Sequence, residues 1–233
     1  MGDYEKDVII RHALCGADKR LKSSSMLLEY QEIANEDVER LGLGKEKTWD
    51  KGLLWVMARQ RFLIHRMPLY REEVKFSTWP NGVIRFLYPR SYAAYAKDGS
   101  LLIEGTSIWT LIDATTRKPI IPEERDLLVE DGASGRPFEM PSSVRCPLFL
   151  PQKAELEAKW SLCDPNGHLN NAKYLDACED LIPADFLLSH PLKGLEIDYR
   201  KEIPLGEKVT LSYGEKEGSY FFRCDSFHLR LIY

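Results

Sequence analysis

One short turn of this chain brings a carboxylate, an amide and an imidazole together. The run Asp164-Pro165-Asn166-Gly167 has the residue types that favour a type I turn, with aspartate first, proline second and glycine fourth. His168 follows at once, and the two asparagines after Leu169 are residue types that commonly begin a helix. Such groups can take up a proton, orient a water molecule or donate to a developing negative charge. The segment therefore predicts an active site at the start of a helix.

The segments on either side of this turn must hold it in place. Apolar and polar residues alternate over 155–162, which predicts a half-buried strand before the turn. After it, apolar residues at helical spacing predict a helix that starts at Asn170 or Asn171. Pro183 is expected to bend or end that helix.

The beginning of the chain repeats this arrangement. Residues 13–15 (Ala-Leu-Cys) match residues 161–163 (Ser-Leu-Cys), and leucines follow at corresponding positions without a gap. A Val- and Ile-rich segment precedes the match over 4–12. A helix is predicted after it over 23–41, led by three serines and stopped at Gly42. Chance similarity among short β-rich segments is the alternative to a true repeat.

Several strands are predicted after the helix in each unit, separated by Gly or Asn-Gly turns. Their ranges are 75–79, 84–96 and 101–112 in the first unit, and 209–213, 220–225 and 229–233 in the second. Residues 122–151 are rich in proline and glycine, as linkers are. We therefore predict an α+β chain in which an antiparallel sheet wraps around a helix twice. The first unit spans 1–128, the linker 129–151 and the second unit 152–233.

Only the second unit keeps the polar set. Opposite the three polar residues of the turn the first unit has Gly16, Asp18 and Arg20. Aligning the two Pro-Leu segments that follow places Arg66 opposite Glu202. This difference predicts one active site per chain, in the second unit, with the first unit binding substrate and supporting the fold.

Composition narrows the function classes. The chain has 233 residues, 44% of them hydrophobic, and a formal net charge of −4, which gives no sign of nucleic-acid binding. Its five cysteines are widely spaced and are expected to be reduced. The polar start does not look like a signal peptide, and no apolar run is long enough to span a membrane. A cytoplasmic protein without membrane insertion is expected.

The run from Asp164 to Tyr174 resembles the Asp-x-Asn-x-His-Val-Asn-Asn-x-x-Tyr signature of acyl-[acyl-carrier-protein] thioesterases, the tandem hotdog hydrolases of fatty-acid synthesis. Further segments look like elements of that family in the right order: residues 55–59, 76–80, 106–109, 116–122 and 198–202. The resemblance implies a tandem hotdog fold and hydrolysis of a fatty acyl thioester, without a cofactor or metal. The start of the chain shows no plastid transit peptide, which implies the bacterial type.

Carried over residue by residue, the resemblance implies that Asp164, Asn166, His168 and Glu202 form the catalytic set. In plant members a cysteine after the glutamate was proposed as a nucleophile. Here that position is Ile203, so a covalent cysteine route at this place is excluded.

We expect direct attack by an activated water molecule. Glu202 is the expected general base, alone or together with His168. Asn166 is expected to orient the water or to donate to the thioester oxygen, and Asp164 to fix the turn. Backbone N–H groups after Asn170 are expected to help hold the oxyanion. Cys163 is interpreted as a small packing residue.

The sequence gives less evidence about how the substrate is bound than about the catalytic residues. Apolar residues of the first helix could line an acyl pocket or belong to the core: Met26, Leu27, Tyr30 and Ile33. The implied partner is the acidic acyl carrier protein, for which basic residues are candidates: Lys153, Lys159, Lys173, Arg200 and Lys201. The oligomeric state is left open between monomer and homodimer.

Three other functions remain open at this point. A hotdog thioesterase acting on a coenzyme A ester would share the local motif. A non-catalytic acyl-binding hotdog protein could keep the polar set without turnover. A hotdog dehydratase fits less well, because the Asn-x-His-x-Asn-Asn context is not expected in it.

Overall fold

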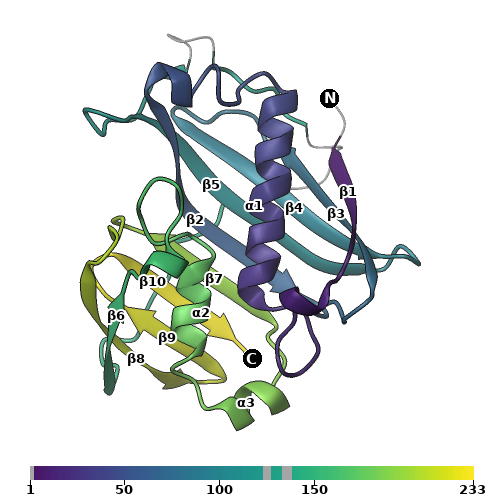
Figure 1. The fold of residues 1–233 in the computed structure, drawn as a ribbon, viewed down its shortest axis with the longest axis vertical. Helices are drawn as coiled ribbons and strands as arrows, with labels where there is room; N and C mark the ends of the chain where they lie inside the picture. The colour runs from purple at the N-terminus through teal and green to yellow at the C-terminus, as the bar shows by residue number, and fades with distance from the viewer. Residues whose placement is uncertain (1–2, 123–126, 133–137) are drawn as a thin grey trace.

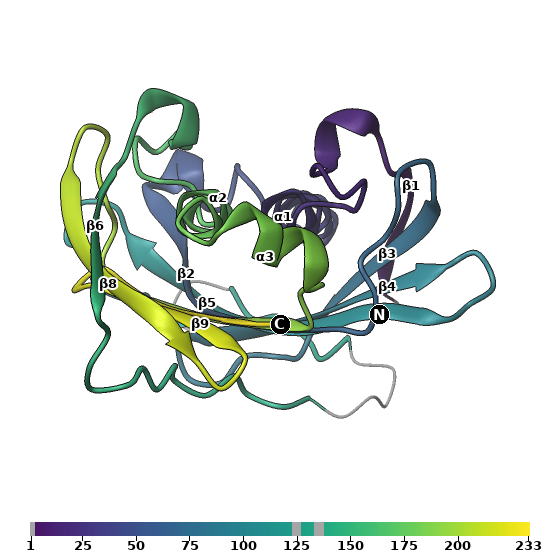
Figure 2. The same ribbon diagram turned by 90° about the horizontal axis from the view of Figure 1, so that it is seen from below.

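The computed structural model describes residues 3–122, 127–132 and 138–233. A single curved antiparallel sheet forms one layer, and the helices lie together on its concave face (Figures 1 and 2). The predicted antiparallel sheet with few helices is thus present. None of the described helices is long and apolar enough to cross a membrane.

The sheet has ten strands in the described residues, and all their pairings are antiparallel. In chain order they are β1 (Tyr4–Ile9), β2 (Leu53–Ile64), β3 (Glu73–Pro80), β4 (Leu87–Ala96), β5 (Leu101–Asp113), β6 (Gln152–Glu157), β7 (Gly194–Tyr199), β8 (Lys208–Lys216), β9 (Ser219–Arg223) and β10 (Phe227–Ile232).

The order of the strands across the sheet is β1-β3-β4-β5-β2-β7-β10-β9-β8-β6. We call β1–β5 with their helix the first half, and β6–β10 with theirs the second half. From the outer edge inward, the first half reads β1-β3-β4-β5-β2 and the second half reads β6-β8-β9-β10-β7. In both halves the second strand along the chain is therefore the innermost one. The two halves meet where β2 pairs with β7, from Arg59 opposite Asp198 to Leu63 opposite Gly194.

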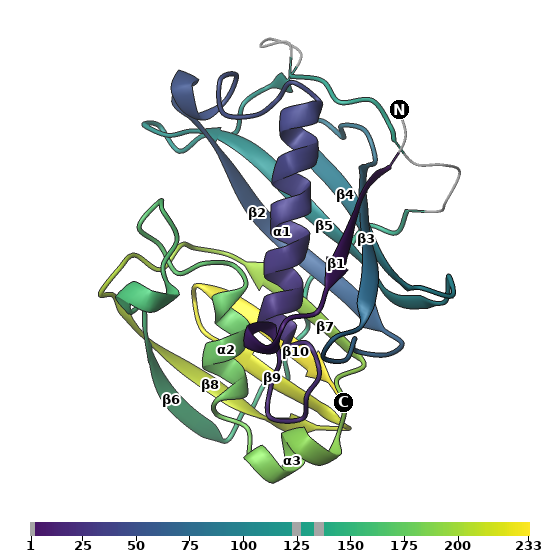
Figure 3. The ribbon, with the colours of Figure 1, turned by 45° about the vertical axis from the view of Figure 1, so that its right-hand side comes forward.

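The α-helices of the described residues lie on the concave face: α1 (Ser23–Arg40), α2 (Lys173–Glu179) and α3 (Ala184–Ser189). In Figure 3 the long α1 stands over the first half, and α2 lies beside its lower end. The predicted helix of the second half begins later than expected. The reason is that the Asn170 side chain accepts a hydrogen bond from the Ala172 N–H (2.9 Å), which holds a turn before the helix. α2 already ends at Glu179, before Pro183, and Pro183 instead stands directly before the short helix α3, which was not predicted.

The prediction of a strand over 155–162 was wrong in its second part. β6 ends at Glu157, and a short 3-10 helix, η4 (Trp160–Leu162), takes the place of the expected strand end. The Trp160 side chain, expected on the buried face, is 83% exposed. Alternation alone predicts the period of a strand but not where its antiparallel partner β8 begins, which is at Lys208 opposite Glu157.

The core lies between the helices and the sheet. The four side chains of α1 that could have lined an acyl pocket are all buried in this core: Met26, Leu27, Tyr30 and Ile33. The Tyr30 ring stacks on the ring of Phe62 from β2, with 5.0 Å between centroids. These residues therefore hold the first half together rather than line either of the two pockets described below.

The two halves build the same turn before their helix. η1 (His12–Leu14) leads into an antiparallel bridge between Cys15 and Leu21, and η4 leads into one between Cys163 and Leu169. The correspondence found in the sequence over these residues is therefore also a correspondence in backbone structure.

The correspondence further along the chain needs one correction. The leucine that closes each turn donates its N–H to the Pro68 carbonyl in the first half and to the Ile203 carbonyl in the second, both at 2.8 Å. Met67, not Arg66, therefore takes the place of Glu202. Aligning the two prolines had shifted the match by one residue, since proline is compatible with either position in such a loop.

Residues 138–151, just before β6, run along the outer face of the sheet (Figure 2). Asp198 of β7 holds them there, accepting a hydrogen bond from the Val144 N–H at 3.0 Å and pairing with Arg59 at 3.2 Å. Arg223 donates to the Pro147 carbonyl at 3.0 Å. Gly135 and Pro137 of the predicted linker lie outside the described residues.

A carboxyl group lies where the two halves touch on the concave face. Ser23, at the start of α1, donates to Glu179 of α2 at 2.8 Å. Burial, and secondarily the charges of Asp176, Asp180 and Asp18, raise the pKa of Glu179 to about 7. The folded protein therefore holds a proton on Glu179 at pH values where the unfolded chain has lost it. The associated stabilisation is present below about pH 4.5 and is lost as the pH rises to about 7.

This linkage predicts that Glu179→Gln changes the pH dependence of stability. The free energy of unfolding of the variant, relative to the wild type, should increase by about 1–3 kcal/mol between pH 5 and pH 8, because glutamine carries no charge to bury. Urea unfolding at both pH values measures this. Glu217→Gln, whose side chain is 84% exposed, serves as the control. An equal difference at both pH values would contradict the prediction.

Candidate active site

The turn at 164–168 is organised by Asp164. The Gly167 N–H donates to the Asp164 carbonyl at 3.0 Å, and the Asn166 N–H donates to the Asp164 carboxylate at 2.9 Å. Gly167 has a φ of +79°, a conformation that glycine adopts without strain. The Asp164 N–H in turn donates to the His168 carbonyl at 2.9 Å. Asp164 therefore fixes the backbone from which the Asn166 and His168 side chains project.

Glu202 comes to this turn from the end of β7. A bridge between His168 and Pro204 brings the two segments together. His168 Nε2 and Glu202 Oε2 are 3.6 Å apart, too far for a direct hydrogen bond but close enough to act on one small molecule between them. The two side chains are 25% and 34% exposed, so solvent reaches both.

Asp164, Asn166, His168 and Glu202 all line one open pocket of about 410 Å³. The structure thus brings together the four residues selected from the sequence. Residues of the first half complete the wall: Trp55, Val56, Met57 and Arg117. The pocket therefore lies between the halves.

A buried chain of hydrogen bonds supports the pocket from both halves. Gln60 of β2 donates from Nε2 to the Tyr199 hydroxyl at 2.9 Å, and that hydroxyl donates to the Asn171 carbonyl at 2.7 Å. Asn171 lines the pocket directly. Sequence reasoning assigned no role to Gln60 or Tyr199, although Tyr199 lies in the segment 198–202 that resembled the family.

The expected backbone oxyanion donors are largely engaged elsewhere. The Ala172 N–H donates to the Asn170 side chain at 2.9 Å, and the Lys173 N–H donates to the Asn170 carbonyl at 2.8 Å. By contrast, the Asn166 side chain makes only a long contact with Asp164, 3.5 Å from Nδ2 to Oδ2. The Asn166 amide is therefore the better placed donor for a substrate oxygen.

The cysteine beside the turn is not placed to act as a nucleophile. Cys163 Sγ donates weakly to the Ala158 carbonyl at 3.7 Å, and burial raises the pKa of its thiol, which favours the unreactive form. Ile203 is fully buried. Among the described residues, no group of three or more His, Cys, Asp or Glu side chains is arranged to hold a metal ion.

A second, narrow pocket opens next to the first. Trp55 lines both, and the second continues between the C-terminal part of α1 and the sheet, along Val38, Leu43, Tyr88 and Trp109. Most of its wall is apolar. The polar pocket therefore shares Trp55 with a small, mostly apolar pocket of about 40 Å³.

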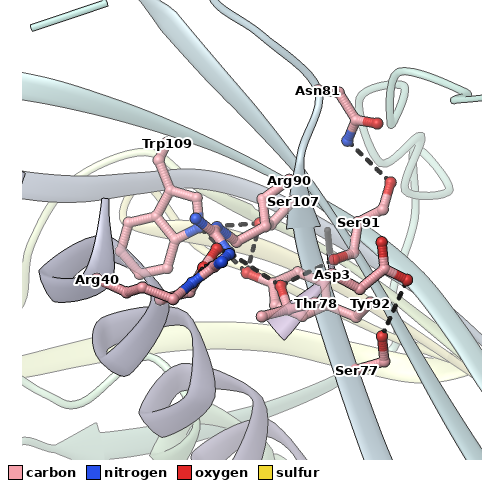
Figure 4. Close-up of polar contacts among 11 residues, drawn as sticks. Asp3, Arg40, Ser77, Thr78, Asn81, Arg90, Ser91, Tyr92, Ser107 and Trp109 are labelled. Carbon is pink, nitrogen blue, oxygen red and sulfur yellow. Dashed lines mark hydrogen bonds and ion pairs between the residues drawn. The ribbon is translucent and has the colours of Figure 1, made fainter. Parts of the chain in front are cut away.

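A buried polar network closes the apolar pocket on the side of the sheet. Arg90, which lines the pocket, donates to Asp37 of α1 at 2.7 Å and to Thr78 at 3.1 Å. The Trp109 indole donates to Ser107 at 2.8 Å. Figure 4 shows Arg90 beside Thr78, with Trp109 and Ser107 adjacent.

The large antiparallel sheet wrapped around its helices gives the molecule a hotdog-like architecture. Residues 2–125 match the family model of the acyl-ACP thioesterase N-terminal domain, and residues 150–226 match that of the acyl-ACP thioesterase C-terminal domain. The chain belongs to the acyl-ACP thioesterase family.

Individual proteins are similar to this chain in sequence or in fold. A chloroplastic palmitoyl-acyl carrier protein thioesterase of Gossypium hirsutum is 27% identical over 85% of this chain and 52% of its own length. The chain thus spans about half the length of the curated relatives it matches. An acyl-ACP thioesterase structure from Bacteroides thetaiotaomicron matches the fold with a TM-score of 0.86, at 22% identity over 99% of this chain and 97% of that one. The 12:0-ACP thioesterase of Umbellularia californica matches with a TM-score of 0.82, at 18% identity over 99% and 96%.

Proposed function

We propose that this protein hydrolyses fatty acyl-ACP thioesters with an activated water molecule and releases the free fatty acid. The observation that carries the proposal is the convergence of Asp164, Asn166, His168 and Glu202 on one pocket, beside an apolar pocket that shares Trp55 with it. Membership of the acyl-ACP thioesterase family supports it.

We also propose that each half is one hotdog unit, residues 1–128 and 152–233, joined by the linker 129–151. The matching succession of strands and the matching turns before the helices support this division. The unit that carries the polar set is catalytic, and the other provides the apolar pocket.

In the proposed reaction, Glu202 takes a proton from a water molecule, either alone or sharing the role of general base with His168. The water oxygen bonds to the thioester carbon, and the carbonyl electron pair moves to the oxygen, where the Asn166 amide donates to it. When this intermediate collapses, the carbon–sulfur bond breaks and the leaving thiolate takes the proton back. The products are a fatty acid and the free thiol, so no co-reactant is required.

The carrier protein would reach the open side of the polar pocket. Arg200 and Lys201 line that pocket and offer positive charge to an acidic partner. Lys173, another candidate, is already paired with Asp176 at 2.7 Å, so it is less available.

Hydrolysis of matched acyl-ACP and acyl-CoA substrates tests the proposal. We expect release of free fatty acid with a higher kcat/KM for the carrier-protein substrate at each chain length, and a product profile with a preferred length. A preference for the CoA ester would favour a CoA thioesterase. Absence of turnover on both would favour a non-catalytic acyl-binding protein.

A further inference from the structure

We propose that Arg117, supplied by the first half, positions Glu202 of the second half for proton transfer, so that the active site is complete only where the halves meet. This inference rests on the proposed function, since it concerns the same reaction. It assigns a role to a residue outside the set of four.

The contact is direct. The Arg117 guanidinium forms an ion pair with Glu202 through its Nη2 atom and Glu202 Oε2. His168 Nε2 approaches the same oxygen, at 3.6 Å. Within the described residues, the contacts of the Glu202 carboxylate with Arg117 and His168 both fall on Oε2, which leaves Oε1 as the oxygen that can accept a proton from water.

Arg117 is held in place before any substrate arrives. It lies in the turn after β5, where Asp113 accepts hydrogen bonds from the N–H groups of Thr115 (3.0 Å) and Thr116 (2.7 Å) through its side chain. The Arg117 N–H donates to the Asp113 carbonyl at 2.9 Å. Arg117 itself has a φ of +59°, which is uncommon for a residue with a side chain and indicates a specifically shaped turn.

The expected contribution is to chemistry rather than to stability. The side chains of Arg117 and Glu202 are 43% and 34% exposed, and ion pairs this accessible to solvent add little to the free energy of unfolding. The guanidinium holds the Glu202 carboxylate beside His168, and a general base must be held in this way if it is to take a proton from a bound water molecule.

The test compares Arg117→Gln and Arg117→Lys on two thioesters of the same acyl chain, one on the carrier protein and one on N-acetylcysteamine, which carries no phosphate. Arg85→Gln is the matched control, because Arg85 is an exposed arginine with a φ of +60° in another turn of the first half. We expect kcat of Arg117→Gln to fall about 10–100-fold on both substrates with KM nearly unchanged. Arg117→Lys should recover part of the rate.

Three results would overturn this role. A rise in KM confined to the carrier-protein substrate, with kcat intact, would make Arg117 a binder of the substrate phosphate. An active wild type with an unimpaired Arg117→Gln would remove Arg117 from the reaction while leaving the proposed function standing. A wild type inactive on both thioesters would overturn the proposed function and this role together.

Discussion

Replacing Glu202 by glutamine is expected to lower kcat for thioester hydrolysis about 10²–10⁴-fold, the usual contribution of a positioned general base. Glutamine keeps the size of the side chain and can still contact Arg117, but its amide cannot take a proton from water. KM should change little, because the acyl chain binds elsewhere. Steady-state and single-turnover assays with a carrier-protein substrate measure the two quantities separately.

The matched control is Glu207→Gln, five residues further along the same segment and outside the polar pocket. It should retain nearly full activity. His168→Ala is expected to lose activity on the same scale as Glu202→Gln if both groups act on one water molecule, and the double variant should then lose little more. A Glu202→Gln variant with more than about a tenth of the wild-type kcat would exclude Glu202 as the base.

The local part of this site was predictable from the sequence. Asp164, Asn166 and His168 lie within one turn whose residue types determine its geometry, so their proximity follows from local rules. Glu202 was found only because the family resemblance pointed to it. The antiparallel sheet around a helix also followed from periodicity and from the internal repeat.

The contacts between the halves were not predictable in the same way. Arg117 meets Glu202, and Gln60 meets Tyr199, only because β2 pairs with β7 in one register. A change of this register by one residue would turn the Gln60 side chain away from Tyr199, to the other face of the sheet. No local sequence pattern predicts these contacts, because the two residues of each contact are far apart along the chain.

A buried ion pair lies beside the apolar pocket, between Asp37 and the pocket residue Arg90. Asp37 points from α1 into the first half with no exposed surface, and it pairs with Arg90 at 2.7 Å and with Arg40 at 2.6 Å. The apolar periodicity of the helix did not predict that Asp37 is buried. Its burial is tolerated because the two guanidinium groups satisfy the carboxylate where water does not reach it.

Asp37→Ala is therefore expected to destabilise the fold by about 3–5 kcal/mol, since it leaves Arg90 buried without its carboxylate partner. Urea unfolding with an unchanged m-value is the measurement. The control is Asp50→Ala, which removes an exposed pair with Lys45 and should cost no more than about 1 kcal/mol. A loss as small as that of the control would contradict the prediction.

The double variant Asp37→Leu with Arg90→Met separates the charge from the packing. Exchanging both members of a buried ion pair for apolar groups is often neutral or stabilising, so most of the loss should be recovered. Arg90 also lines the apolar pocket, and the exchange would replace a polar wall by an apolar one. The double variant should therefore regain stability while shifting the product profile toward longer acyl chains, because the pocket would no longer end against a charged group. Recovered stability with an unchanged profile would show that the acyl chain does not reach Arg90.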